Sequence, residues 1–202
     1  MTTQMPLIIF WFRRDLRLGD NHGLAEALKT AKARQFAVLP IFIFDENILR
    51  DLPKDDARVT FIADCLQQMQ TELAEENKTF QVYHGRPQTV FKQLIEKYDI
   101  RAVFCNHDYE PQAMQRDLAV KAMLNEHGVA FRHFADQVIF EKGQVLKADG
   151  KPYTVFTPYK KRWLQQFDAE NDGLDNFYYI GKFFCNFFIS GRYRFLSFLN
   201  NG

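Results

Sequence analysis

Two clusters of charged and polar side chains are the residues of this chain best suited to hold a ligand. Arg13, Arg14 and Arg17 alternate with acidic residues in the first cluster, and the second runs from Asn106 to Glu110. Guanidinium groups bind phosphates or carboxylates, whereas carboxylates accept hydrogen bonds from N–H and O–H groups. The arginines are therefore interpreted as a phosphate clamp or as a structural charge network, and the network is favoured because unpaired buried arginines are costly. For the second cluster, a metal site is an alternative interpretation, because it contains one histidine and two carboxylates.

Each cluster directly follows an apolar stretch. Leu7–Phe12 is a continuous run of β-branched and aromatic residues, which is typical of a strand buried on both faces, and Ala102–Asn106 is a shorter run of the same kind. Asp20-Asn21 then offers side chains that cap a helix N-terminus. Ligands of open α/β sheets bind outside the carboxyl ends of the strands, so both clusters lie at the expected ligand edge.

The rest of the chain alternates between strand and helix patterns. Expected strands are Leu7–Phe12, Phe36–Phe44, Thr79–His84, Ala102–Asn106 and Val129–Phe134, and expected helices are Asn21–Ala33, Asp56–Asn77, Pro87–Tyr98 and residues 111–128. This alternation predicts an α/β fold, namely a Rossmann-like, doubly wound, five-stranded parallel sheet with helices on both faces, over residues 5–135.

Two details of these elements are specific predictions. Pro40 lies inside the second strand, where it cannot donate to the ladder, so the strand is kept as a prediction and a bulge is allowed there. In the last helix of the domain, Met114, Leu118 and Ala122 recur at helical spacing and are predicted to face the core.

The chain beyond residue 135 has a different pattern. Residues 136–172 are predicted to form a connecting hairpin, from Val138–Glu141 and Val145–Lys147, followed by a helix capped by Thr157. Residues 173–202 form an atypical tail, with seven Phe, three Tyr and no acidic residue within Phe177–Gly202. An uncovered apolar segment is unusual at a soluble terminus, and a frameshifted gene end is one hypothesis for it.

Composition excludes several classes of protein. A formal net charge of +1 over 202 residues gives no global argument for nucleic acid or membrane binding. Cys65, Cys105 and Cys185 are scattered, which indicates reduced thiols. The N-terminus has no basic segment of a signal peptide and no apolar run is long enough to span a membrane, so a cytoplasmic protein is expected. There is no G-x-G-x-x-G turn and no P-loop.

Three ordered stretches carry a resemblance to a known family. They are Phe-Trp-Phe-Arg-Arg-Asp-Leu-Arg-Leu-Gly-Asp-Asn at 10–21, Asn-His-Asp-Tyr-Glu-Pro at 106–111 followed by Arg116-Asp117, and Lys-Pro-Tyr-Thr-Val-Phe-Thr-Pro-Tyr-Lys at 151–160. Together they resemble the N-terminal antenna domain of the DNA photolyase/cryptochrome family, over about residues 7–168.

The resemblance implies a pigment site. In members with a deazaflavin or flavin antenna, the pigment lies at the carboxyl ends of the strands. The matching residues of this chain are Arg14, Phe42, Ile43, Phe44, Asp45, Asp108 and Glu110. By their types alone, without the resemblance, Phe42 and Phe44 are interpreted as core residues and Asp45 as a turn cap. Members with a methenyltetrahydrofolate antenna use an amide and a glutamate where this chain has Gln112 and Ala113, which favours a deazaflavin or flavin pigment.

The resemblance also implies a function. Family members repair cyclobutane pyrimidine dimers in DNA with blue light, and FAD and the damaged base occupy a longer C-terminal helical domain. These 202 residues do not resemble that second domain. The chain is therefore expected to bind an antenna chromophore, to meet FAD and damaged DNA only through the missing domain, and to lack catalytic residues. The alternatives are a cryptochrome-like blue-light photoreceptor fragment and an inactive remnant; the lesion class and oligomeric state stay open.

Overall fold

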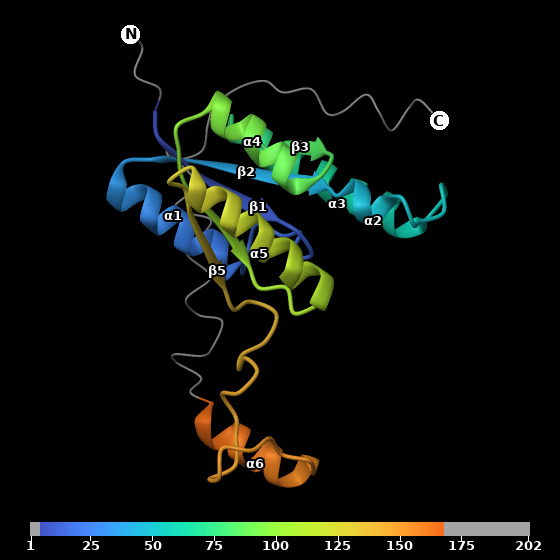
Figure 1. Ribbon diagram of the computed structural model, residues 1–202, viewed down its shortest axis with the longest axis vertical. Coiled ribbons are helices and arrows are strands. Elements are labelled where there is room, and N and C mark those ends of the chain that lie inside the picture. The colour runs from blue at the N-terminus through green and yellow to red at the C-terminus, as the bar shows by residue number, and fades with distance from the viewer. Residues whose placement is uncertain (1–4, 168–202) are drawn as a thin grey trace.

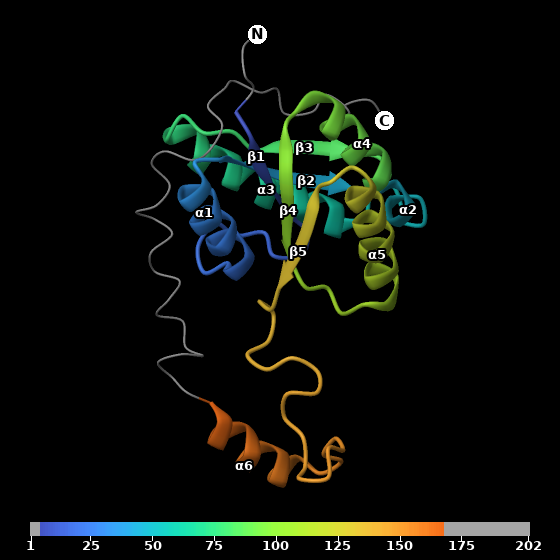
Figure 2. The same ribbon diagram turned by 60° about the vertical axis from the view of Figure 1, so that its left-hand side comes forward.

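A computed structural model describes residues 5–167 of the chain, and its centre is a five-stranded parallel sheet (Figures 1 and 2). The strands lie in the order β3-β2-β1-β4-β5, so that the chain extends the sheet in one direction from β1 to β3 and in the other through β4 and β5. This confirms the doubly wound α/β fold. The strands are β1 (Leu7–Phe12), β2 (Ala37–Phe44), β3 (Gln81–His84), β4 (Ile100–Asn106) and β5 (Ala130–Phe134).

Helices cover both faces of the sheet. Alternate residues of β1 point to opposite faces: Phe10 packs in the cluster that contains α1 and α3, and Trp11 packs in the cluster that contains α4 and α5. The strand is thus buried on both sides, as its continuous apolar run predicts. The helices are α1 (His22–Arg34), α2 (Glu46–Leu49), α3 (Ala57–Glu75), α4 (Pro87–Lys97), α5 (Pro111–Glu126) and α6 (Phe156–Gln166).

Local sequence signals set where several helices begin. The Asn21 side chain accepts a hydrogen bond from the Leu24 backbone N–H at 3.1 Å, which caps α1 as expected. Pro87 and Pro111 occupy the first turns of α4 and α5, where the missing N–H of proline removes no helical hydrogen bond. These starts place the helix N-termini beside the carboxyl ends of the strands.

The strand predicted through Pro40 forms, and it does so without the bulge that the proline would allow. The register between β1 and β2 is continuous from Leu7↔Ala37 to Phe12↔Phe42, with Pro40 opposite Phe10. On the other side of β2, pairing with β3 begins only at Ile41. The proline therefore lies where one side of the strand is still unpaired, and the ladder accommodates it without a bulge.

The prediction that Met114, Leu118 and Ala122 of α5 face the core is wrong. Met114 and Leu118 are 53% and 66% exposed, whereas Val120 and Leu124 are fully buried. The buried face also carries Asp117, whose carboxylate pairs with Arg13. An acidic residue on that face hides it from a pattern based on apolar residues alone.

The predicted connecting hairpin does not form. Between β5 and α6 the backbone makes turns without strands, and Val138 and Ile139 are about half exposed. The Gln144 backbone N–H donates to the Glu141 carbonyl, and the Gln144 side chain accepts from the Glu141 N–H, so a local turn uses the groups that a ladder would need.

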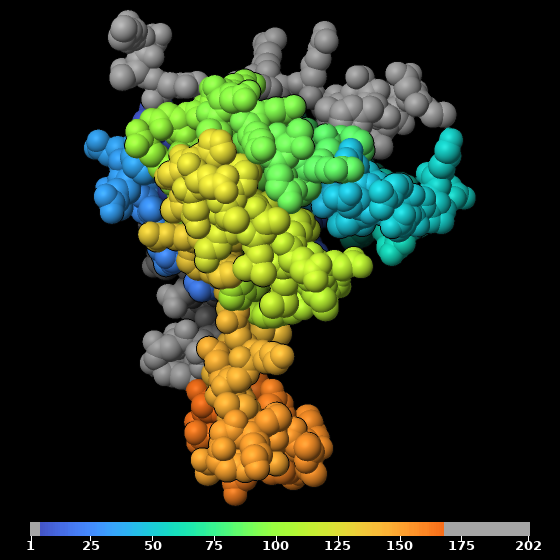
Figure 3. Space-filling model, in the orientation of Figure 1, coloured from blue at the N-terminus to red at the C-terminus, as the bar shows by residue number. Residues whose placement is uncertain are grey.

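The α6 helix lies away from the sheet, at the end of this connecting segment (Figures 1 and 3). It begins at Phe156, one residue before the predicted Thr157 cap, and no side chain caps it. Trp163 stacks on Phe167 with ring centroids 5.1 Å apart and meets the edge of Phe140 at 5.4 Å, so the helix packs on its own segment.

No helix within residues 5–167 is long and apolar enough to cross a membrane. The predicted tail, residues 173–202, lies outside the described residues.

Candidate ligand-binding site

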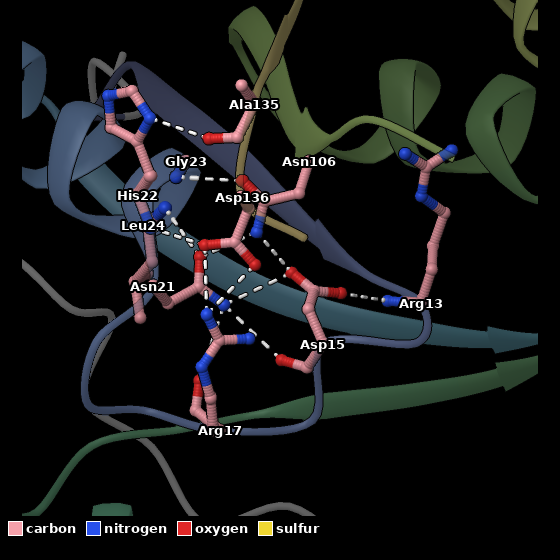
Figure 4. A network of polar contacts seen from close by, with 10 residues as sticks. All are labelled: Arg13, Asp15, Arg17, Asn21, His22, Gly23, Leu24, Asn106, Ala135 and Asp136. Atoms are coloured by element: carbon pink, nitrogen blue, oxygen red, sulfur yellow. Dashed lines mark hydrogen bonds and ion pairs between the residues drawn. The ribbon is translucent and has the colours of Figure 1, made fainter. Parts of the chain in front are cut away.

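The strand order reverses between β1 and β4, and the crevice at this point is filled by the protein's own side chains (Figure 4). Asn106 Oδ1 accepts the Gly23 backbone N–H at 2.8 Å, while Asn106 Nδ2 donates to Asp15 Oδ2 at 2.5 Å and to Asn21 Oδ1 at 2.8 Å. Asn21 and Asn106 are 0% and 2% exposed. The helix α1 N-terminus is where such folds commonly bind phosphate, and here its N–H groups are already satisfied.

A second carboxylate completes this network. Asp136 accepts two hydrogen bonds of 2.9 Å from Arg17 and another of 2.9 Å from the His22 backbone N–H. Arg13 pairs with Asp117 at 2.5 Å. The arginines are thus matched by carboxylates, which confirms the charge-network interpretation and leaves no open phosphate clamp at α1.

A cavity of about 700 Å³ lies beside this network, at the carboxyl ends of β1 and β2 and next to the N-terminal half of α5. Its volume is in the usual range of small-molecule sites. The lining consists of Trp11, Arg13, Arg14, Phe42, Ile43, Phe44, Asp45, Asn47, Ile48, Leu49, Arg50, Asp51, Leu52, Arg58, Val59, Ile62, Gln88, Asp108, Glu110, Gln112, Ala113, Gln115, Arg116 and Ala119.

All seven predicted site residues line this one cavity. The end of β2 supplies an aromatic wall, in which the Phe42 and Phe44 rings meet edge to face with centroids 5.0 Å apart. Both rings also belong to the core cluster around α1 and α3, so the core and the ligand interpretations hold together. Asp45 caps α2 through the Asn47 N–H at 3.0 Å, as the turn-cap interpretation expects, and still reaches the cavity.

The opposite side of the cavity is charged. Arg14 Nη1 lies 2.6 Å from Glu110 Oε1 and 3.7 Å from Asp108 Oδ1, which joins the turns after β1 and β4. The Asp108 side chain is 8% exposed and lies 3.9 Å from Arg116. A ligand here meets both carboxylate acceptors and guanidinium donors.

Several lining residues are not predicted as site residues from the sequence. Trp11 is expected only as part of a strand, although the structure brings its ring to the cavity between Arg13 and Arg116. The loop around α2 has no predicted element and supplies lining residues from Asn47 to Leu52. The Arg116-Asp117 pair, a few residues after the second polar cluster, is the signal in the sequence for that side of the cavity.

A separate cluster after β4 fixes the connecting segment. His107 Nδ1 forms a hydrogen bond with Glu141 Oε1, and the Tyr109 hydroxyl donates to the same oxygen at 2.9 Å. Burial and this bond to Glu141 raise the pKa of Tyr109 to about 12. Within residues 5–167, no group of three or more His, Cys, Asp or Glu side chains is arranged to hold a metal ion.

The fold and the cavity define a class: a doubly wound α/β domain with a small-molecule site at the carboxyl edge of its sheet. The profile of the DNA photolyase family matches residues 8–175, and the chain belongs to that family.

Individual relatives agree with this assignment. The deoxyribodipyrimidine photo-lyase of Synechococcus sp. is 35% identical over 159 residues, which cover 79% of this chain and 32% of the relative. A bacterial class III photolyase from Agrobacterium tumefaciens superimposes with a TM-score of 0.69 at 27% identity, over 84% of this chain and 33% of that one. An archaeal photolyase from Sulfolobus tokodaii, solved with two FAD molecules, superimposes with a TM-score of 0.65 at 29% identity, over 78% of this chain and 34% of that one. The chain thus spans about a third of the length of these relatives.

Proposed function

We propose that this chain is an antenna-chromophore-binding domain, and that the cavity beside β1, β2 and α5 holds a flavin or deazaflavin pigment. The observation that carries the proposal is that the seven residues expected at a pigment site from the family resemblance all line one cavity of about 700 Å³. The Sulfolobus tokodaii relative contains two FAD molecules and is described as implicating a novel light-harvesting cofactor, which supports the choice of a flavin-type ring.

The lining suits a planar heteroaromatic ring. Phe42, Ile43 and Phe44 offer an apolar wall, on which a ring system can stack. Asp45 and Asp108, both nearly buried, accept hydrogen bonds from ring N–H or hydroxyl groups. Arg14, held by Glu110, is placed to donate to ring carbonyl oxygens.

The same lining disfavours a folate pigment. Gln112 and Ala113 both face the cavity at the start of α5. Ala113 offers only a methyl group where folate-binding members use a glutamate, so an acceptor for the pterin is missing. A flavin or deazaflavin uses the carboxylates that are present.

An absorption spectrum of the purified chain, combined with the mass of any released chromophore, tests the proposal. A band between the near-ultraviolet and the blue, with a flavin or deazaflavin mass, is the expected result. If the chain purifies colourless and binds neither flavin nor deazaflavin in a titration, it is an inactive remnant instead.

The activity of the full-length relatives extends this proposal. In a complete photolyase the absorbed energy would reach a second flavin that repairs cyclobutane pyrimidine dimers in DNA. This chain supplies the light-collecting part, in the cytoplasm, and reaches damaged DNA only through a further domain.

A further inference from the structure

Trp11 occupies an unusual electrostatic environment at the cavity. The residue is 2% exposed, and its indole ring lines the cavity and packs edge-on against Phe91, with ring centroids 5.2 Å apart. Two guanidinium groups lie against the same ring: Arg13 Cζ is 5.3 Å and Arg116 Cζ is 4.9 Å from its centroid. The contacts come from the turn after β1 and from α5, so the fold assembles this arrangement from distant parts of the chain.

Two guanidinium groups contact this ring, and they share a carboxylate partner. Asp117 pairs with both guanidinium groups, at 2.5 Å to Arg13 and 3.1 Å to Arg116, so one carboxylate serves two cations. Asp108 lies farther away, at 3.9 Å from Arg116, and also faces Arg14. The Arg13 and Arg116 side chains are 6% and 15% exposed, and buried charges are screened only weakly by salt. Asp15, whose carboxylate also accepts the Arg13 backbone N–H, interacts electrostatically with the Arg13 guanidinium as well, and Figure 4 shows that this guanidinium extends away from the Asp15–Asn106 network.

This arrangement has a consequence for a light-harvesting pigment in the cavity. Indole is an electron-rich side chain, and a photoexcited flavin-type ring is a strong one-electron oxidant. If one electron passes from the Trp11 ring to the excited pigment, the indole becomes a radical cation, the pigment is reduced by one electron, and the excitation is lost as heat when the charges recombine. An antenna pigment beside an unprotected tryptophan would therefore be quenched.

We propose that Arg13 and Arg116 suppress this quenching, because their positive charges destabilise a radical cation on Trp11 by Coulomb repulsion. The inference rests on the proposed pigment site and concerns three residues that line it, Trp11, Arg13 and Arg116. Arg13 and Arg116 act on Trp11 and need not touch the pigment. Their part is to preserve the excited state long enough for energy transfer.

The test is the excited-state lifetime of the bound pigment, measured by time-resolved fluorescence on the purified chain loaded with flavin or deazaflavin. Arg116→Gln and Arg116→Met, which remove the charge and keep most of the side chain, are expected to shorten the lifetime roughly threefold or more. Adding Trp11→Phe to either variant should restore it. Arg58→Gln is the matched control, because Arg58 also lines the cavity but pairs with Asp56 away from Trp11.

The outcomes separate the inference from the pigment proposal. Absence of bound pigment in the unmodified chain contradicts the proposed function itself. Bound pigment with an unchanged lifetime in the Arg116 variants overturns only the inference. So does a several-fold longer lifetime in Trp11→Phe alone, because Trp11 would then be an active quencher in the native protein, and this variant leaves all the charged residues of the cavity in place.

Discussion

The side-chain oxygen of Asn106, at the end of β4, accepts a hydrogen bond from the backbone nitrogen of Gly23, in the first turn of α1, over 2.8 Å. The approach requires glycine, because a Cβ atom added at position 23 would lie 2.4 Å from that oxygen and 3.0 Å from the Phe10 ring. This contact fills the crevice at the centre of the sheet, and the neighbouring cavity stays open.

Gly23→Ala should destabilise the domain by about 1–3 kcal/mol, because the helix must move away from β4 or Asn106 must leave its buried network. Urea unfolding followed by circular dichroism measures the change. Gly19→Ala is the control: nothing lies within 4 Å of a Cβ there, so its stability should change by only about 0.5 kcal/mol or less. Equal effects of the two substitutions would contradict the close-packing argument.

Asp108→Asn and Asp45→Asn should each weaken pigment binding about tenfold or more, since each removes a charged acceptor that is nearly buried at the cavity. Asparagine keeps the capping ability of position 45, so α2 is retained. A titration with flavin or deazaflavin measures the affinity. Asp99→Asn removes a carboxylate that pairs with Arg101 and takes no part in the cavity, and it should bind like the unmodified chain.

Stability should fall in alkali because of Cys105. Burial raises the pKa of this thiol from 9.0 to about 12. Since the folded-state pKa is the higher one, its contribution is complete below pH 9 and is lost between pH 9 and 12, by about 1.4 kcal/mol for each pH unit. Urea unfolding at pH 8 and pH 10.5 measures the loss. It should be smaller in Cys105→Ala and unchanged in Cys65→Ala, the half-buried cysteine on α3; a Cys105→Ala variant with the full alkaline loss would assign that loss to other groups.

Acid should release the segment between β5 and α6 from His107 and Tyr109, which hold it through Glu141. Burial alone would raise the pKa of Glu141, but hydrogen bonds from His107 and Tyr109 outweigh it and lower the pKa. A lowered folded-state pKa means that this attachment is complete at neutral pH and is lost as the pH falls through that value. Limited proteolysis between β5 and α6, with a protease active across this pH range and its rate divided by that on an unstructured peptide, should therefore accelerate as the solution is acidified. Glu141→Gln should be cleaved rapidly at higher pH as well, and an unaltered pH profile in this variant would show that Glu141 does not hold the segment.

The purified chain should not repair thymine dimers under blue light. The repair chemistry of full-length relatives is expected to lie in the part of their sequences that this chain does not match, since the chain covers about a third of their length. A dimer-repair assay with and without illumination measures this, with a full-length photolyase as the positive reference. Light-dependent repair by this chain alone would place a catalytic centre within its 202 residues.

Most of the fold could be predicted from local signals. The apolar runs of β1 and β2, the Asn21 cap and the proline in the first turn of α5 are properties of neighbouring residues, so they are visible in the sequence. The core face of α5 is a different case. Asp117 is tolerated there because Arg13, 104 positions earlier, neutralises it, and only the folded structure brings the two together.

The candidate site could be predicted only in part, because some of its residues follow local signals and others are brought together only by the fold. The resemblance indicates residues at the carboxyl ends of β1, β2 and β4, and their common cavity follows from parallel strands ending at one edge. The contribution of Trp11 depends on the side chains of α5 that surround it, and the loop with α2 is a single short turn without a periodic pattern. Neither leaves a signature in the sequence.

The cavity draws its lining from residues between Trp11 and Ala119. Protein synthesis proceeds from the N-terminus, so every lining residue has been made before β5, the connecting segment and α6 are translated. The described lining is therefore complete in the chain before these elements are made, while the Arg17–Asp136 pair that braces the turn after β1 forms only after residue 136 has been added.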